Sequence, residues 1–402
     1  MRKPTMLYAS PFPPQQSGIS DYSTYMAPAL QEFFDVTLYT GDYKLAVPEL
    51  RENFPVIRHG VDEVRFEAYD HLVYQIGNNP WYHGYIYEAC LRHPGLVILH
   101  EFVIYYLVVG LYRDRPDFYS RLYEIGGAPA ISAVKAMAKE GTDLLRFSRP
   151  EELPLCRELL LSGNRIAAHC EYTRGRAQAE TNIPVSLIHL AQGEPRQAPR
   201  RSRQEVLAEL DIPQNAVVIG SLGFIAATKL NHLACRAVSR LHREGRKDVY
   251  YLMIGEGDYV NSYLDGPVRI TGYVPEDRFD AYLDACDLIL NLRYPTMGET
   301  SASLLRAMQF SKPCIITDVG WFSELPGDAV LKLGAESVDL IEEQIYQALD
   351  IFLSNRRPFV RMAQVGAAYV RQQHSPAGVA REIHRILTEQ VPQSKAFYAN
   401  PV

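Results

Sequence analysis

The segment Asn291–Met308, NLRYPTMGETSASLLRAM, carries the strongest chemical pattern in the chain. Arg293 follows a predicted buried strand, and Gly298 lies in the loop after it. Thr300 and Ser301 stand where the next helix is predicted to begin, with free amides and hydroxyls. Amides at a helix N-terminus attract anions, and an arginine adds a charged, forked donor. This pattern predicts a cradle for a diphosphate.

Two further polar positions indicate contacts with hydroxyl groups. Glu299 lies inside the same loop and would repel a phosphate, so we expect its carboxylate to accept hydrogen bonds from a sugar or a ribose. His100 and Glu101 form a polar pair at the end of another predicted strand. A histidine there can bind a sugar hydroxyl or a phosphate, although a purely structural histidine fits the same pattern.

Glycine turns at the ends of two predicted strands offer further anion sites. Gly18 follows the strand Thr5–Ala9, within PFPPQQSGISDYS. Gly223 follows the strand Ala216–Leu222, and Lys229 opens the next helix. A lysine at the carboxyl edge of a sheet is well placed to pair with a phosphate. Plain tight turns and a solvated lysine are the alternatives that these residue types leave open.

Apolar runs of strand length alternate with amphipathic helical stretches along the chain. The predicted strands are Thr5–Ala9, Asp35–Tyr39, His71–Ile76, Leu96–His100, Arg165–His169, Val185–Ile188, Ala216–Leu222, Val249–Ile254, Val268–Thr271, Leu288–Leu292 and Pro313–Thr317. The predicted helices are Ser20–Phe33, Tyr85–Arg92, Ser132–Glu140, Glu151–Leu161, Tyr172–Glu180, Lys229–Glu244, Glu276–Cys286, Ser301–Phe310, Val338–Ser354, Val360–Gln373 and Pro376–Glu389. This alternation predicts α/β architecture, with parallel sheets covered by helices on both faces.

A polar, basic, proline-containing segment, Gln192–Arg203, interrupts the alternation and predicts a linker. We therefore expect doubly wound domains over 1–195 and 205–375. The first carries a helical insertion at about 102–161, and a final helix and tail over 376–402 cross back to it. Such sheets bind ligands beyond the carboxyl ends of their strands, so a cleft between two of them predicts a deep site.

Composition excludes several classes of protein. The chain has 402 residues, of which 47% are hydrophobic and 22% charged, so it is neither disordered nor fibrous. Its net charge of -6 argues against a nucleic-acid partner, because such binding depends on neutralising phosphates. The longest apolar helical run, Phe102–Tyr112, is about 11 residues, whereas a bilayer needs about 20. We expect no signal peptide, a cytoplasmic location, and 6 reduced, buried cysteines.

Absent motifs narrow the chemistry further. The chain contains no Walker loop, so a P-loop NTPase is not expected, and it has neither HExxH nor GxSxG. It also contains no D-x-D tripeptide, which removes the ligands for a metal-bridged diphosphate of that kind. We therefore expect a leaving diphosphate to be stabilised by amides and cations.

Taken in order, these motifs resemble those of family 4 glycosyltransferases, which have the GT-B fold of two Rossmann-like domains facing a cleft. The segments that carry the resemblance are PPQQSGISDY (13–22), LHEF (99–102), AAHCEYTRGR (167–176), IGSLGFIAATK (219–229), GYVPEDRFDAYLDACDLIL (272–290) and GETSASLLRAMQFSKPCIITDVG (298–320). They are similar to the family's glycine loop, its "HD" segment, the close of its N-terminal domain, its donor loop, its nucleotide-base strand and its E-x7-E segment.

The resemblance implies a retaining hexosyltransferase of polysaccharide or glycoconjugate biosynthesis. A nucleotide-sugar donor would bind mainly to the C-terminal domain, and a glycan or lipid-linked acceptor mainly to the N-terminal one. Attack would come from the donor's front face, the donor phosphate helping to take the acceptor proton, without a metal or other cofactor. A lipid-linked acceptor would bring peripheral contact with the inner face of the membrane.

The resemblance also implies site residues. It places His100, Glu299 and Lys229 at the reacting centre. It assigns donor binding to Gly18, Gly223, Lys229, Tyr273, Arg293, Gly298, Thr300 and Ser301.

Two positions depart from the family pattern. Phe224 stands where the donor loop usually carries an arginine, and Arg306 stands at the second glutamate of E-x7-E, with Glu299 one residue late. We hypothesise that Arg293 or Arg306 replaces the missing charge. Alternatives are a GT-B protein that binds without catalysis, and a phosphorylase or epimerase of the same fold.

Overall fold

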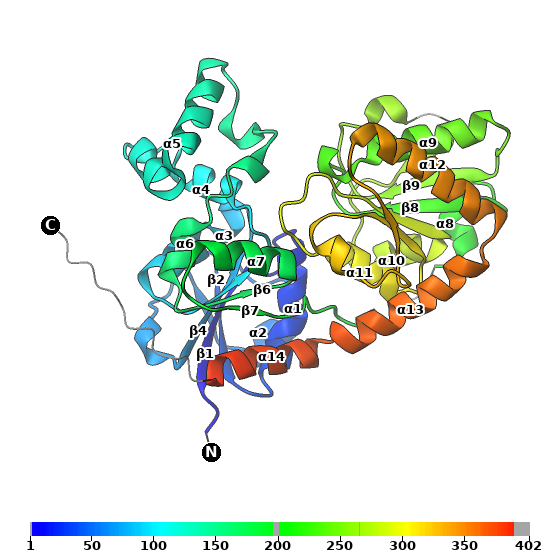
Figure 1. The fold of residues 1–402 in the computed structure, drawn as a ribbon. Coiled ribbons are helices and arrows are strands. Elements are labelled where there is room, and N and C mark those ends of the chain that lie inside the picture. The colour runs from blue at the N-terminus through cyan, green and yellow to red at the C-terminus, as the bar shows by residue number, and fades with distance from the viewer. Residues whose placement is uncertain (1, 196–200, 265, 390–402) are drawn as a thin grey trace.

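The computed structural model describes residues 2–195, 201–264 and 266–389, and within them the chain forms two α/β domains (Figure 1). Sheet A has seven strands in the order β3-β2-β1-β4-β5-β6-β7, and sheet B has six in the order β10-β9-β8-β11-β12-β13. All their pairings are parallel, as the sequence predicts. The middle of the predicted linker (196–200) and the predicted tail (390–402) lie outside the described residues.

The strands agree closely with the predicted ones. Sheet A contains β1 (Thr5–Ala9), β2 (Asp35–Thr40), β3 (Val56–Arg58), β4 (His71–Ile76), β5 (Leu96–Leu99), β6 (Arg165–Ala168) and β7 (Val185–Leu187). Sheet B contains β8 (Val217–Leu222), β9 (Val249–Ile254), β10 (Val268–Ile270), β11 (Leu288–Asn291), β12 (Cys314–Thr317) and β13 (Leu331–Leu333). Only β3 and β13 were not predicted. Each is an edge strand of 3 residues with partly exposed side chains, so it lacks a continuous apolar run.

The helices cover both faces of each sheet. In the N-terminal half they are α1 (Gly18–Leu30), α2 (Pro48–Asn53), α3 (Pro80–Arg92), α4 (Tyr105–Tyr112), α5 (Phe118–Lys139), α6 (Arg157–Ser162) and α7 (Glu171–Glu180). In the C-terminal half they are α8 (Arg203–Glu209), α9 (Asn231–Arg243), α10 (Glu276–Ala285), α11 (Ala302–Gln309), α12 (Val338–Ser354), α13 (Arg357–Gln373) and α14 (Pro376–Thr388). Short 3-10 helices are η1 (Phe66–Ala68), η2 (Leu144–Arg146), η3 (Pro150–Glu152), η4 (Ala227–Lys229), η5 (Asn261–Tyr263) and η6 (Gly320–Glu324).

The helical insertion differs most from the prediction. Helix α5 consists of two helical stretches joined at a kink, and the predicted helix Ser132–Glu140 covers only part of the second stretch. Gly127 at the kink has φ 65 and ψ -163, and Pro129 follows it, so the sequence there reads as a helix break. The predicted helix Glu151–Leu161 is divided into η3 and the shorter α6. Helix α5 stands above the N-terminal domain, whereas α6 lies beside α3 (Figure 1).

Alternate residues of a strand face opposite sides of a sheet, and this separates the buried side chains into distinct clusters. Leu7 and Ala9 of β1 pack under α3 to α6, whereas Met6 and Tyr8 face α1. The cluster on the α1 side continues into the C-terminal domain beneath α10, α11 and α13. A third cluster lies under α9 and α12. As predicted, all six cysteines are buried, and none of them forms a disulfide bond.

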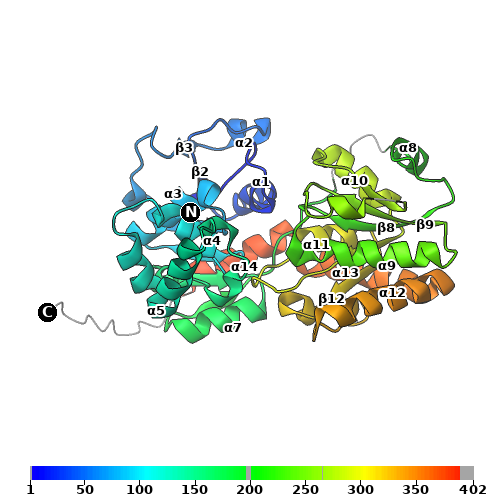
Figure 2. The same ribbon diagram turned by 90° about the horizontal axis from the view of Figure 1, so that it is seen from above.

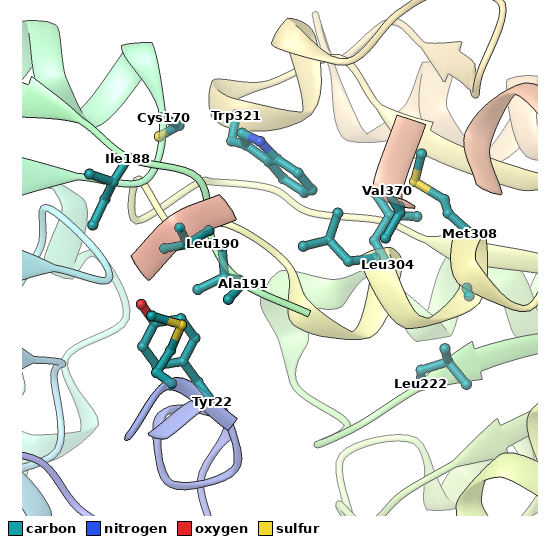
Figure 3. Close-up of a cluster of buried hydrophobic side chains, with 14 of the residues drawn as sticks. Tyr22, Cys170, Ile188, Leu190, Ala191, Leu222, Leu304, Met308, Trp321 and Val370 are labelled. Carbon is teal, nitrogen blue, oxygen red and sulfur yellow. The ribbon is translucent and has the colours of Figure 1, made fainter. Parts of the chain in front are cut away.

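Apolar side chains join the two domains. Ile188, Leu190 and Ala191, which follow sheet A, share one buried cluster with Leu304 of α11 and Trp321 of η6. In Figure 3, Leu190 and Ala191 lie on the side of this cluster that faces Leu304. The chain then crosses between the domains a second time, from α13 into α14 (Figures 1 and 2). Both crossings therefore contribute to the contact between the two domains.

Helix α14 packs on the N-terminal domain. The His384 ring stacks on Phe33, with their centroids 4.7 Å apart. The Glu382 carboxylate accepts the backbone amide and Nδ1 of His189, each at 2.8 Å. Part of the N-terminal domain's cover is therefore supplied by the other end of the chain.

Candidate functional site

A cavity of about 680 Å³ lies between the two domains. On the N-terminal side it is lined by the loop 13–17 and the first turns of α1. On the C-terminal side it is lined by residues that follow β8 and β9, by Tyr273 and Val274, and by the start of α11. The cavity therefore lies beyond the carboxyl ends of the central strands, where doubly wound sheets bind their ligands.

Three of the residues predicted as donor-binding line this cavity: Gly18, Gly223 and Tyr273. Gly18 is the first residue of α1, which Ser17 caps by accepting the Ser20 amide at 3.1 Å. Gly223 has φ 79, a conformation that favours glycine. The start of α1 thus faces a glycine turn across the cavity. The first amides of α1 are suited to an anion, whereas the Gly223 amide donates to the Ile254 carbonyl at 2.8 Å.

Aromatic rings line the C-terminal side of the cavity. Tyr273 is 57% exposed and Phe224 is 64% exposed, and Phe279 of α10 lies nearby in the lining. Large exposed aromatic side chains in a cavity are suited to stacking against flat or apolar ligand faces. Phe224 thus offers a stacking surface at the position where the resemblance leads us to expect an arginine.

Lys229 lies directly behind the glycine turn. Its ammonium donates to the Leu222 carbonyl at 2.9 Å, and a Cβ placed on Gly223 would lie 3.1 Å from it. Burial, assisted by the nearby Arg293 cation and opposed by Glu299, lowers the pKa of Lys229 to about 7. The ammonium is thus poorly solvated and close to the cavity. A bound anion would stabilise its charge, so this position suits an anion-binding group.

Arg293 and Glu299 form an ion pair that the sequence does not predict. Arg293 Nε lies 2.5 Å from Glu299 Oε1, and both side chains are largely buried. The second Glu299 oxygen accepts the Met297 amide at 2.7 Å and the Thr296 hydroxyl at 3.1 Å. The expectation that Glu299 points at ligand hydroxyls is therefore corrected, since its carboxylate is engaged within its own loop.

The loop 296–298 is docked on the N-terminal domain. The Phe102 and Val103 amides donate to the Met297 carbonyl at 3.0 and 3.1 Å, and the Thr173 hydroxyl donates to the Gly298 carbonyl at 2.5 Å. The Gly298 amide donates to the Thr296 hydroxyl. Gly298 thus serves the domain interface, and its backbone is not free for the predicted cradle.

The start of α11 also differs from the expectation. Ser301 is buried, and its hydroxyl caps the helix by accepting the Leu304 amide at 3.2 Å while it contacts Asn291. The Thr300 hydroxyl is enclosed by protein. The prediction of a free hydroxyl is therefore wrong for Ser301, and the Thr300 hydroxyl is buried without a hydrogen-bond partner among the described residues. The residues of α11 that reach the cavity are Ala302, Ser303 and Arg306.

His100 lies deeper, at the carboxyl end of β5. Its Nε2 is 2.7 Å from Oε1 of Gln75, and its ring meets the Tyr22 ring edge-on at 5.1 Å. Burial, with His169 and His83 close by, lowers the pKa of His100 well below its usual value. A neutral His100 donates to Gln75. The structure does not bring His100 into the lining of the cavity.

Arg306 lines the cavity but is held by carboxylate and carbonyl groups. It binds both oxygens of Asp280 in α10, at 2.9 and 2.6 Å. Arg306 and Gln309 also donate to the carbonyl of Gly193, in the linker. Arg293 and Arg306, the two arginines proposed to replace the charge missing at Phe224, are thus both paired with carboxylates. Asp280 was not predicted, because its partner lies 26 residues away in the sequence.

Replacing Asp280 with asparagine should lower the free energy of unfolding by about 2–4 kcal/mol, because it leaves a buried guanidinium without its counter-ion. The Arg306 and Asp280 side chains are 8% and 15% exposed. Urea unfolding of the variant and of the wild type measures the difference. The control is E152Q, which breaks the exposed Arg149–Glu152 pair and should change stability little. Equal effects of the two substitutions would contradict the importance of burial.

Two further properties can be stated of the described residues alone. No group of three or more His, Cys, Asp and Glu side chains among them could hold a metal ion, and metal independence stays a prediction. None of their helices is both long enough and apolar enough to cross a bilayer.

Comparisons with known proteins agree with this architecture. Residues 214–354 match the family model described as "Glycosyl transferases group 1". No curated protein sequence matches the chain.

Solved structures match over nearly the whole chain. Sucrose-phosphate synthase from Thermosynechococcus elongatus has 13% identity and a TM-score of 0.64, covering 96% of this chain and 98% of its own. HepE from Anabaena, solved with UDP-glucose, has 12% identity and a TM-score of 0.64, covering 96% and 99%. WaaG, a glycosyltransferase involved in lipopolysaccharide biosynthesis, has 14% identity and a TM-score of 0.60, covering 96% and 100%. The chain thus has the GT-B fold of glycosyltransferases, and its C-terminal domain matches the group 1 family.

Proposed function

We propose that the protein is a retaining glycosyltransferase that moves a sugar, a hexose, from a nucleotide-sugar donor to a glycan or lipid-linked acceptor. The observation that carries this proposal is the cavity between the domains, where the Gly18 turn faces the Gly223 turn and the Lys229 ammonium lies behind the latter. Amides and a poorly solvated cation at this edge suit a diphosphate, which is the leaving group of such donors.

The C-terminal side of the cavity supports donor binding there. Tyr273 and Phe279 offer surfaces for a base, and Ala302 and Ser303 present the start of α11 to the phosphates. The family match covers this domain, and the Anabaena neighbour was solved with UDP-glucose. We infer that the donor's nucleotide lies on sheet B and its sugar points toward sheet A.

The N-terminal side supports a separate acceptor. The loop 13–17 and the first turns of α1 close the cavity opposite the donor surface. The similar protein WaaG is involved in lipopolysaccharide biosynthesis. We infer polysaccharide or glycoconjugate biosynthesis in the cytoplasm, without a metal, and with peripheral membrane contact where the acceptor is lipid-linked. We infer retention of the anomeric configuration from the resemblance of the loop segments to those of family 4 glycosyltransferases.

Thermal unfolding with a panel of ligands tests this proposal. The panel contains UDP-glucose, GDP-mannose and dTDP-rhamnose, together with UDP, GDP and dTDP. A ligand that binds only the native state raises the melting temperature by mass action, so one sugar nucleotide and its bare diphosphate should stabilise the protein. The anomeric configuration of the product, read by NMR, tests retention, and turnover in EDTA tests metal independence. The absence of any shift across the panel would contradict the donor site.

A second candidate is a GT-B protein that binds nucleotide sugars without transferring them. The observation that favours it is the engagement of Glu299 with Arg293, together with Arg306 at the second glutamate of the family pattern. Stabilisation by a sugar nucleotide with neither transfer nor hydrolysis across an acceptor panel would support this candidate. A requirement for free phosphate would instead indicate a phosphorylase, and turnover without an acceptor an epimerase.

A further inference from the structure

Glu101 occupies the junction between the two domains, directly after β5. The amides of the next two residues, Phe102 and Val103, donate to the Met297 carbonyl of the opposite domain. Glu101 is therefore placed beside the loop that carries Arg293 and Glu299. Both of these side chains interact electrostatically with its carboxyl group.

The loop around Glu101 is well ordered by hydrogen bonds. Its Oε1 accepts the Asn78 amide at 3.0 Å. Oδ1 of Asn78 accepts the Leu107 amide at 3.1 Å and so ties this loop to α4. These bonds hold the Glu101 carboxyl group in one position at the carboxyl edge of sheet A.

Among the residues that the structure describes, none forms a salt bridge with Glu101. The facing cation, Arg293, forms its ion pair with Glu299 instead. The other titratable groups that interact with Glu101 are Glu299 and, from α4, the phenol of Tyr106. A partly buried carboxyl group beside a second, already paired carboxylate is more stable with its proton. In agreement, burial and the Glu299 charge raise the pKa of Glu101 to about 8.

We propose that Glu101 contacts the sugar of the donor as a neutral carboxylic acid and donates a hydrogen bond to a sugar hydroxyl. This inference rests on the proposed function. Neither Glu101 nor Arg293 lines the cavity at Gly18 and Gly223, so under this proposal the sugar must extend from the diphosphate beyond this lining, toward the domain junction where Glu101 lies. A neutral carboxyl group can donate and accept there without repelling the diphosphate.

The ionisation of Glu101 gives this contact a definite pH dependence. Below pH 8 the carboxyl group holds its proton and donates, whereas above it the carboxylate only accepts and repels the donor's charge. The affinity for the sugar nucleotide should therefore fall by up to about tenfold for each pH unit above 8, relative to the bare diphosphate. Lys229 affects both ligands through the phosphates, so its titration cancels in this ratio.

Calorimetry on the full-length protein with UDP-glucose, GDP-mannose, UDP and GDP tests the proposal, using E101L and E101Q. The leucine cannot hydrogen-bond, so E101L should bind the active sugar nucleotide about 10- to 100-fold more weakly and its bare diphosphate within about threefold of wild type. The amide of E101Q donates and accepts without titrating. E101Q should keep wild-type affinity within about threefold at pH 7 and lose the decline above pH 8.

Each outcome is decisive. If E101L weakens the binding of both ligands equally, or weakens the binding of neither, the sugar contact is overturned while the donor site stands. An alkaline decline that persists in E101Q would overturn the role of the proton. Unimpaired binding of the bare diphosphate shows that each variant is folded. A wild-type protein that binds none of the four probes would overturn the proposed function itself, and this inference with it.

Discussion

Replacing Arg293 with alanine is expected to weaken donor binding by about 100-fold or more. The substitution removes a cation near the proposed phosphate position and also leaves Glu299, 19% exposed, without its ion-pair partner. A hydrogen bond to a charged group contributes about 1.5–3 kcal/mol, the unpaired Glu299 carboxylate adds repulsion of the phosphates, and each 1.4 kcal/mol is a factor of about ten in affinity. Calorimetry with the stabilising sugar nucleotide measures the loss.

The double variant R293A/E299Q separates these two contributions. If the unpaired carboxylate causes most of the loss, neutralising Glu299 should restore a large part of the affinity. If the cation contacts the phosphates directly, the double variant should stay as weak as R293A. Unchanged donor affinity in R293A would show that Arg293 contributes no charge to the site and would refute the hypothesis that it replaces the arginine missing at Phe224.

The fold could be predicted to a large extent because its determinants are local. The central strands are short, fully buried apolar runs such as Leu96–Leu99, and amphipathic helices separate them. Where the local signal fails, the prediction fails as well. The edge strands β3 and β13 lack a buried run, and the stretch of α5 before the kink at Gly127 was not predicted.

The site was predicted only where position along a strand decides it. Gly18 and Gly223 follow strands of two parallel sheets, so their place at the cavity follows from topology. The pairing of charged groups is different in kind. Glu299 pairs with Arg293, and Arg306 pairs with Asp280. Both pairs depend on how α10, α11 and the domain interface pack. No spacing in the sequence distinguishes these partners from the ligand groups that we expected.

The Lys229→Met substitution should lower donor affinity by about 10- to 100-fold at pH 6, because a hydrogen bond to a charged group contributes about 1.5–3 kcal/mol. K332M is the matched control. Lys332 of β13 also donates to a backbone carbonyl, that of Ser323 at 2.7 Å, but lies outside the cavity lining. It should leave donor affinity unchanged, and equal losses in both variants would contradict a specific role for Lys229.

The low pKa of Lys229, about 7, also predicts the direction in which donor affinity changes with pH. A diphosphate favours the protonated lysine, so wild-type affinity should fall as pH rises through 7, with proton uptake on binding, whereas K229R should show no such step because arginine stays charged.

The same lowered pKa separates binding from folding. Without ligand, the buried ammonium costs folding free energy below pH 7, and this cost disappears between pH 7 and the unfolded pKa as the native state releases its proton. Ligand-free K229M should therefore melt above wild type at pH 6, by a margin that shrinks as pH rises. A variant that is more stable yet binds the donor more weakly cannot owe its loss to misfolding. A melting temperature below that of wild type at pH 6 would contradict the desolvated lysine, and with it the reason to place the phosphates beside Gly223.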